Sequence, residues 1–244
     1  GPESIIFMLV FMALTYFVVS RGVKGGIEKA NLVMMPALII MAAGVAIYAL
    51  TLPGAIEGLS YYFVPDFSAF SPELVISALG QTFFTLSLAM GIMVTYGSYL
   101  DKTSKLTSSV GQIAGTTFGV SLLAGLMIIP AAFAAMGSGE AVAENSGPTL
   151  MFVVLPQVFG GLGDMAPIIG GVFFILVLFA ALTSSISLVE TCTAIIQDAT
   201  HCKRSTALIV TIIWTTRMGG IVNLGFGALS FIQPLGEGWT MLDF

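Results

Sequence analysis

The sequence predicts an all-α protein, a polytopic bundle of membrane-spanning helices. Of its 244 residues, 57% are hydrophobic and only 9% are charged, and the mean hydropathy is +1.01. Soluble domains carry about 25% charged residues, whereas several apolar runs in this chain exceed the roughly 20 residues that a helix needs to cross a bilayer. Composition and run length together therefore exclude an ordinary soluble domain.

Six apolar segments are candidate spans within a single membrane domain, residues 1–244. They lie at about 5–20, 30–52, 74–100, 109–136, 166–197 and 206–226. The last is the weakest, because Arg217 and the pair Gly219-Gly220 interrupt it.

The basic residues give the orientation of these segments. Seven of the eight Lys and Arg residues lie in the alternate loops 21–29, 101–108 and 198–205. The intervening loops, 53–73 and 137–165, contain acidic residues and no Lys or Arg. Since basic loops remain in the cytoplasm, we expect a multi-pass protein of the cell (inner) membrane with these three loops inside.

The outer loop 137–165 contains an apolar stretch from Gly147 to Phe159. It is too apolar for a solvated loop and too short for a span. We expect a re-entrant helix that dips toward the bundle and acts as an external lid.

A first polar cluster interrupts the segment 74–100 at mid-depth, where Thr85, Ser87 and Gly91 follow one another closely. Lipid offers a backbone no hydrogen-bonding partner, so a spanning segment is normally an uninterrupted helix. The cluster predicts unwinding near 85–91, and the freed carbonyls and amides can hold an ion or a small zwitterion. The alternative is that each hydroxyl simply bonds the carbonyl one turn earlier.

A second cluster, Thr183, Ser184 and Ser187, lies at mid-depth in the segment 166–197. Hydroxyls and free carbonyls are ligands that Na+ accepts, and the absence of a carboxylate argues against a divalent metal. The alternative is a packing seam of small residues between helices.

Glu190 lies two turns before Asp198, about 12 Å along a helix, and thus in the membrane or at its edge. An ionisable group at that depth is a functional candidate. No nucleophile–base pair, phosphate-binding loop or nucleic-acid patch is present in the sequence, so we expect neither an enzyme nor a nucleic-acid partner.

Four motifs resemble those of the neurotransmitter:sodium symporter family. Residues 80–88, Gly-Gln-Thr-Phe-Phe-Thr-Leu-Ser-Leu, resemble its unwound sixth helix, and residues 180–186 resemble its eighth helix. Residues 147–159 resemble its large outer loop, and Tyr99, Pro130 and the closing Leu242-Asp243-Phe244 also fit. The resemblance covers essentially the whole chain and is strongest for the bacterial branch.

The resemblance implies a partial LeuT-type inverted-repeat fold and Na+-driven symport of an amino acid. It makes Phe84 an aromatic lid over the substrate and places Thr85 against both the substrate and the first sodium ion. The remaining substrate residues are Ser87, Met90, Ser184 and Leu188.

The resemblance also implies the ion sites and gates. By this resemblance, the second sodium ion is bound by Thr183, Ser184 and the carbonyl of Ala180. The cytoplasmic gate is formed by Tyr99, Glu190 and Asp198, and the outer gate by Phe84 and Asp243.

Three positions depart from the family pattern. Ala89 replaces a usual Gly, so we expect a stiffer unwound stretch. Thr117 stands where the first sodium usually takes Asn or Asp, although its hydroxyl oxygen can still ligate. Ser121 stands where some chloride-independent members place a carboxylate, and with Gln81 nearby we hypothesise a chloride site.

The resemblance aligns the chain with the fourth to ninth helices of the family. We therefore expect the first three helices, with the other half of both sodium sites, to belong to a longer parent, and this chain not to transport alone. For the parent we expect alternating-access symport of a neutral, hydrophobic amino acid, with Met90 and Leu188 favouring the apolar substrate. The expected partners are this substrate, Na+, the lipid bilayer and the missing helices.

Two other functions remain open from the residues. A non-transporting membrane interaction or structural module predicts no stabilisation by Na+. A channel or sensor predicts currents or binding without coupled uptake.

Overall fold

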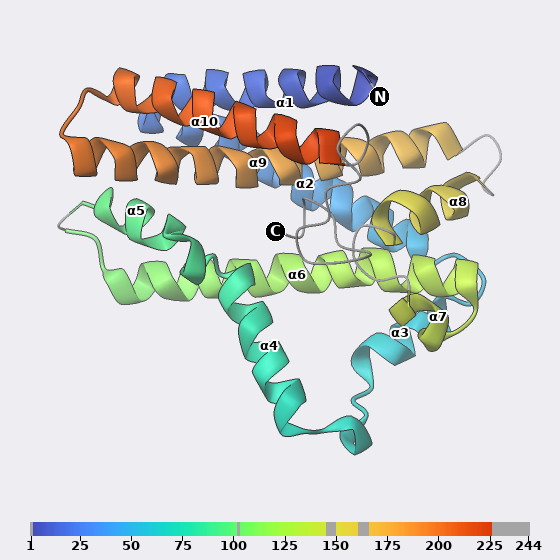
Figure 1. The fold of residues 1–244 in the computed structure, drawn as a ribbon. Helices are drawn as coiled ribbons and strands as arrows, with labels where there is room; N and C mark the ends of the chain where they lie inside the picture. Colours follow the sequence, from blue (N-terminus) through green and yellow to red (C-terminus); the bar gives the residue numbers. More distant parts are fainter. Residues whose placement is uncertain (1, 102, 145–149, 161–165, 226–244) are drawn as a thin grey trace. The chain divides into compact units, whose positions relative to one another are not determined.

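The computed structural model describes residues 2–101, 103–144, 150–160 and 166–225, and every regular element within them is a helix (Figure 1). This confirms the all-α fold class. The long helices are α1 (Pro2–Ser20), α2 (Glu28–Ala49), α6 (Leu106–Met136), α9 (Ala166–Thr200) and α10 (Arg204–Gly225). The short elements are η1 (Val23–Ile27), α3 (Ala55–Phe63), η2 (Phe67–Ala69), α4 (Pro72–Thr85), η3 (Leu88–Met90), α5 (Ile92–Ser98), α7 (Gly139–Glu144), η4 (Leu150–Val154) and α8 (Leu155–Gly160).

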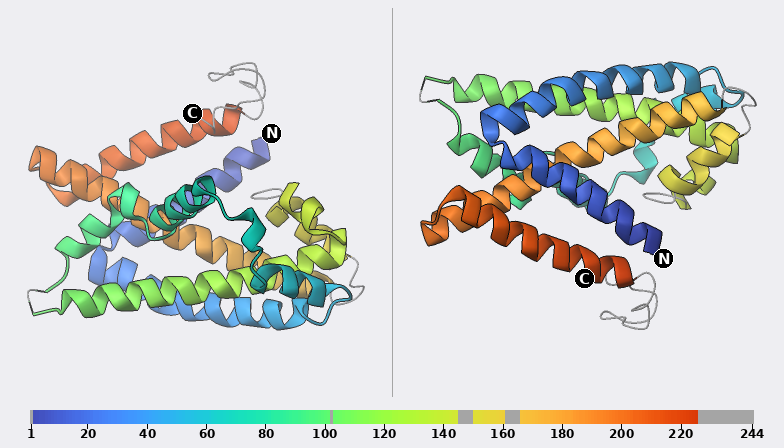
Figure 2. Two further views of the ribbon diagram at one scale, coloured as in Figure 1. Left: turned by 90° about the horizontal axis from the view of Figure 1, so that it is seen from below. Right: turned by 90° about the horizontal axis from the view of Figure 1, so that it is seen from above.

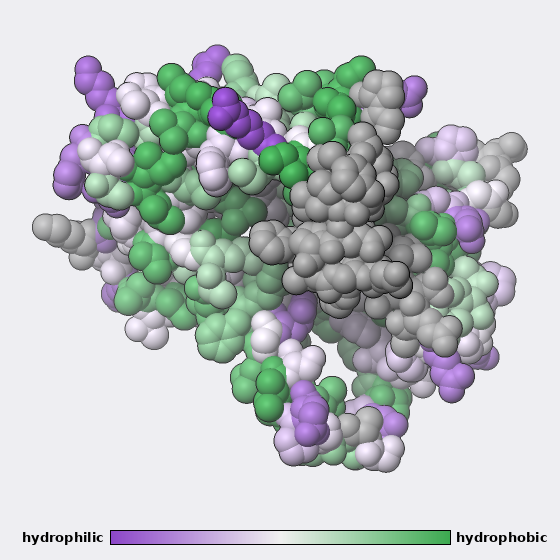
Figure 3. Space-filling model, in the orientation of Figure 1, coloured by the Kyte–Doolittle hydropathy of each residue, from purple (hydrophilic) through white to green (hydrophobic). Residues whose placement is uncertain are grey.

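Five of the described helices are long and apolar enough to cross a membrane. They are Glu3–Ser20, Val23–Ala49, Leu106–Met136, Ala166–Thr200 and Arg204–Leu224. Large hydrophobic side chains on them are exposed, including Phe7 and Ile40, and green apolar residues cover much of the face in Figure 3. Such a surface is stable in lipid rather than in water.

The chain divides into two compact units. The central unit comprises residues 34–180, and the terminal unit comprises residues 1–33 together with residues 181–244. Helices α2 and α9 each contribute residues to both units.

The core of the central unit lies between α2, α6, α8 and the first half of α9. From Met34 onward, α2 runs alongside α6 in both views of Figure 2, and Leu38 and Met127 belong to one buried cluster. Phe159 of α8 and Phe173 of α9 close this cluster with ring centroids 5.3 Å apart. Apolar and small residues thus fill the contact surfaces of all four helices.

Helix α3 lies within the loop 53–73 and packs on α6. Gly58 permits this contact, because a Cβ at that position would lie 2.9 Å from the Cα of Pro130. The ring of Tyr62 occupies the space beside Gly125 of α6, which a side chain at that glycine would need.

After α3, Ser68 donates its hydroxyl and its backbone N–H to Asp66, and these bonds hold the pKa of that carboxyl below its ordinary value.

In the terminal unit, α1 and α10 lie side by side. The hydroxyl of Tyr16 lies 2.6 Å from that of Thr215 and 3.2 Å from that of Thr216. Near the other end of the pair, Asn223 donates its side-chain amide to the hydroxyl of Ser4 at 2.7 Å. Polar contacts therefore join these two helices along their length.

The segment 74–100, for which unwinding near 85–91 was expected, consists of α4, η3 and α5, with an interruption between Thr85 and Ile92. The outer loop 137–165 contains α7, η4 and α8, whereas its residues 145–149 and 161–165 lie outside the described part of the chain.

Candidate functional site

The interruption between α4 and α5 is built from two left-handed residues. After α4 ends at Thr85, Ser87 has φ 55° and Gly91 has φ 72°. Glycine adopts this conformation without strain, whereas a left-handed serine is strained by about 1–2 kcal/mol. Such strain persists only where the surrounding structure fixes it, and it concentrates at functional sites.

Backbone bonds close the end of α4 locally. Leu86 N donates to Thr82 O at 3.0 Å, and Ser87 N donates to Phe84 O at 2.9 Å. On the other side, both the backbone N–H and the hydroxyl of Thr95 donate to Gly91 O. The last four carbonyls of a helix lack partners within the helix, and those of Thr82 and Phe84 are bonded here by the residues that follow α4.

A pocket of about 260 Å³ lies within the central unit between the end of α4 and the middle of α6. Its lining includes four residues that the sequence singled out for ions, namely Gln81, Thr85, Thr117 and Ser121. Gln81 Nε2 lies 3.5 Å from Thr85 Oγ1, and Thr82 Oγ1 donates to Ala78 O at 2.8 Å. Leu86, Ala114 and Phe118 complete the lining, so most of the pocket surface is apolar, and its polar part consists of hydroxyls and a carboxamide, without a carboxylate.

The residues expected to bind substrate belong to both units. Phe84 is 62% exposed in the last turn of α4, and Ser87 and Met90 follow in the interruption, all in the central unit. Ser184 and Leu188 lie in the terminal unit, four residues apart on an exposed face of α9. Their common role in one substrate site stays a prediction.

The second sodium site was expected at Ala180, Thr183 and Ser184 of α9, and the two hydroxyl residues lie one turn after Ala180. Ser187 Oγ donates to Thr183 O at 3.1 Å, so part of this cluster follows the local back-bonding alternative. Its ion-binding role also stays a prediction. Among the described residues, no group of three or more His, Cys, Asp or Glu side chains is placed to hold a metal.

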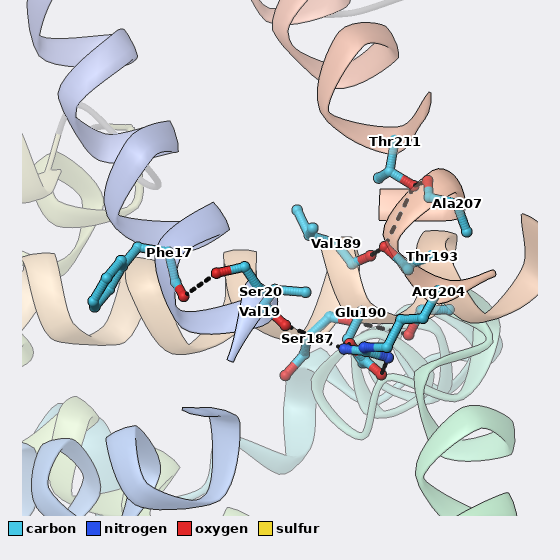
Figure 4. A network of polar contacts seen from close by, with 11 residues as sticks. Phe17, Val19, Ser20, Ser187, Val189, Glu190, Thr193, Arg204, Ala207 and Thr211 are labelled. Atoms are coloured by element: carbon cyan, nitrogen blue, oxygen red, sulfur yellow. Dashed lines mark hydrogen bonds and ion pairs between the residues drawn. The ribbon is translucent and has the colours of Figure 1, made fainter. Parts of the chain in front are cut away.

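Glu190 is fully buried in α9 and forms an ion pair with Arg204, the first residue of α10 (Figure 4). The pair is bidentate, with Nη1 2.8 Å from Oε1 and Nη2 2.6 Å from Oε2. Nη2 also donates to Val19 O, at the C-terminal end of α1, at 3.2 Å. Carboxylate and guanidinium are matched in charge and geometry, and the contact with Val19 brings three helices together.

The other gate residues are placed separately. Tyr99 follows α5 and stacks edge-on against Tyr96, with ring centroids 6.2 Å apart. Asp198 is exposed in the last turn of α9. Asp243 lies outside the described residues.

Sequence reasoning missed the partner of Glu190. It counted Arg204 only as one of the cytoplasmic loop charges, whereas the structure places this guanidinium on the buried carboxylate. A buried acid in a membrane helix needs a cationic partner, and Lys203 and Arg204 are the next basic residues along the chain. Applied to Glu190, this requirement for a cationic partner could have predicted the pairing from the sequence.

The comparisons with known proteins agree on one family. The model of the sodium:neurotransmitter symporter family matches residues 3–237. An uncharacterized sodium-dependent transporter of Bacillus subtilis is 41% identical over 239 residues, which are 96% of this chain and 51% of that protein. The human sodium- and chloride-dependent creatine transporter 1 is 29% identical over 194 residues, 77% of this chain and 30% of that protein.

A solved structure is similar over the same part. The crystal structure of MhsT in complex with L-phenylalanine matches with a TM-score of 0.82 and 39% identity, covering 98% of this chain and 53% of that one. The chain thus spans about half the length of the Bacillus subtilis transporter and of the solved chain, and 30% of the creatine transporter.

The ion pair gives a testable prediction. Arg204→Ala leaves the carboxylate of Glu190 buried without its guanidinium, and removing one partner of a buried pair costs about 3–5 kcal/mol. We expect a smaller loss here, because the Arg204 side chain is 32% exposed and water can partly replace it. The measurement is the melting temperature of the whole protein in detergent, which should fall.

The matched control is Lys203→Ala, which removes a neighbouring exposed cation. Its melting temperature should stay at that of the unchanged protein. Equal melting temperatures for both variants would show that the pair contributes nothing to stability.

Proposed function

Because this chain belongs to the sodium:neurotransmitter symporter family, we propose that the whole protein is a sodium-coupled symporter of a neutral, hydrophobic amino acid. The chain is part of a multi-pass membrane protein, and its family consists of sodium-coupled transporters rather than enzymes. We place it in the cell (inner) membrane, with alternating access as its mechanism and no covalent chemistry.

The observation that carries this proposal is the interrupted helix α4–α5 beside a pocket whose polar lining consists of hydroxyls and a carboxamide. An interruption at membrane depth is tolerated where the backbone is buried in protein or lines a cavity. Discontinuous helices of this kind form ion and substrate sites in secondary transporters, and this same family is a standard example of that rule. Thr85 is the last residue of α4 before the interruption, and it also lines the pocket.

We assign the first sodium ion to Thr85 and Thr117 and the second to Ala180, Thr183 and Ser184. Hydroxyl and carbonyl oxygens are the hard ligands that Na+ prefers. Coupling follows if the amino acid and the ions stabilise the same closed arrangement, since each ligand then raises the affinity for the other.

The hydrophobic substrate is supported by two observations. Met90 and Leu188, the larger aliphatic residues of the proposed side-chain pocket, favour an apolar substrate, and Phe84 provides an aromatic cover. MhsT, which is similar over almost all of this chain, was solved with L-phenylalanine. Gate roles for Tyr99, Glu190, Asp198 and Asp243 complete the proposal.

A chloride ion is the third proposed ligand, at Gln81 and Ser121. Both residues line the pocket together with Thr85 and Thr117, and the carboxamide N–H and the hydroxyls can donate to an anion. The similar human creatine transporter is chloride-dependent by name.

The whole protein in proteoliposomes should accumulate L-phenylalanine against its gradient when Na+ is outside, and not when K+ replaces Na+. Liposomes that contain residues 1–244 alone should show no uptake, because the chain spans about half of its relatives. Binding of the amino acid without uptake by the whole protein would favour a sensor. Neither binding nor uptake would favour a non-transporting interaction module.

Replacing external chloride by gluconate should lower uptake by the unchanged protein. Ser121→Glu supplies a fixed negative charge in the pocket, so its uptake should no longer depend on chloride. The control is Ser109→Glu, which lies on the same helix α6 outside the pocket lining and should keep the chloride dependence. Chloride-independent uptake by the unchanged protein would exclude the chloride site.

A further inference from the structure

Within the terminal unit, α1 forms hydrogen bonds at two positions along its length. One is to α9, and the other is to Arg204 of α10, which is ion-paired with α9. At the first position, Thr15 Oγ1 and Ser185 Oγ lie 3.0 Å apart. At the second position, Arg204, which Glu190 of α9 holds, donates to Val19 O. Thr15 and Val19 lie one turn apart on α1 and are 1% and 0% exposed. The first contact joins α9 to α1 directly and restricts the rotation of α9, and the second joins the Glu190–Arg204 pair to the end of α1.

A second hydrogen bond of Thr15 indicates which of the Thr15 and Ser185 hydroxyls is the donor. Thr15 Oγ1 donates its single hydroxyl proton to Phe11 O at 3.1 Å. Ser185 is therefore the donor to Thr15, whose oxygen is held in place by the backbone of α1. The acceptor is fixed, so the Ser185 side chain can take few orientations.

This bond matters because lipid removes the usual force between helices. Lipid tails are as apolar as leucine, so burial of Leu182 and Ile186 on α9 does not select one rotation of the helix strongly. Directional hydrogen bonds between helices do select one. Ser184 lies about 100° around the helix from Ser185, so a rotation fixed at Ser185 also fixes the direction of Ser184.

We propose that Thr15 is a positioning residue for the sodium site at Thr183 and Ser184. It contacts no ion, and it acts through Ser185, which holds α9 in the rotation that presents the Thr183 and Ser184 oxygens to Na+. The inference rests on the proposed function, since it adds a residue to that sodium site.

The test measures the Na+ concentration that half-saturates L-phenylalanine uptake by the whole protein in proteoliposomes. Thr15→Val keeps the shape of the side chain and removes the hydroxyl. We expect the half-saturating Na+ concentration to rise about threefold, the factor given by a membrane hydrogen bond of average strength. Thr15→Ser restores the hydroxyl and should restore the value.

The matched control is Thr211→Val. Thr211 is also 1% exposed, and its hydroxyl oxygen lies 3.3 Å from that of Thr193 of α9. Thr193 is eight residues beyond Ser185, about 12 Å along the helix. Losing this buried pair should leave the half-saturating Na+ concentration unchanged, although the maximal rate can fall with protein stability.

Ser185→Ala removes the other partner and carries the test alone where Thr15→Val does not fold. It should give the same rise, and the double variant should add nothing further. An unchanged half-saturating concentration in Ser185→Ala, or an equal rise in Thr211→Val, would overturn the inference. Na+-independent uptake by the unchanged protein would instead overturn the proposed function, and the two failures are therefore distinct.

Discussion

The structure depends on one constraint, which is that lipid satisfies no backbone hydrogen bond. Five described helices obey it by remaining continuous over membrane-crossing lengths. The segment between Thr85 and Ile92 does not, and it places a strained left-handed serine at Ser87. A pocket whose polar lining consists of hydroxyls and a carboxamide lies beside this interruption. We therefore propose that the first sodium ion and the chloride ion bind at this exception to the rule.

The lipid environment also explains why polar contacts position the helices of the terminal unit. Apolar side chains are as stable in lipid as against another helix, so they do not determine orientation strongly. Hydroxyl pairs and one ion pair join α1, α9 and α10, at Thr15, Tyr16 and Arg204. These contacts are specific in direction. They can therefore hold α9 in one rotation about its axis.

Much of the fold followed from the sequence, because length, hydropathy and loop charge are local signals. The all-α class, the membrane character and the family were predicted from them and from the motifs, and are confirmed. The hydroxyl cluster near Thr85 also pointed to the place where the structure interrupts the helix. Contacts between distant residues were not predicted: Thr15 and Ser185 are 170 residues apart, and no local pattern joins them. Arg204 was interpreted as a loop charge, because it lies 14 residues after its partner Glu190 and contacts it only once the chain has turned from α9 into α10.

The central claim is our proposal that the whole protein couples the binding of an amino acid to the binding of Na+. Equilibrium binding of L-phenylalanine to the purified whole protein, measured over a range of Na+ concentrations at constant ionic strength, tests it most directly. We expect the affinity for L-phenylalanine to rise with Na+, and we expect that K+ does not substitute. Equal affinity in Na+ and in K+ would contradict the claim.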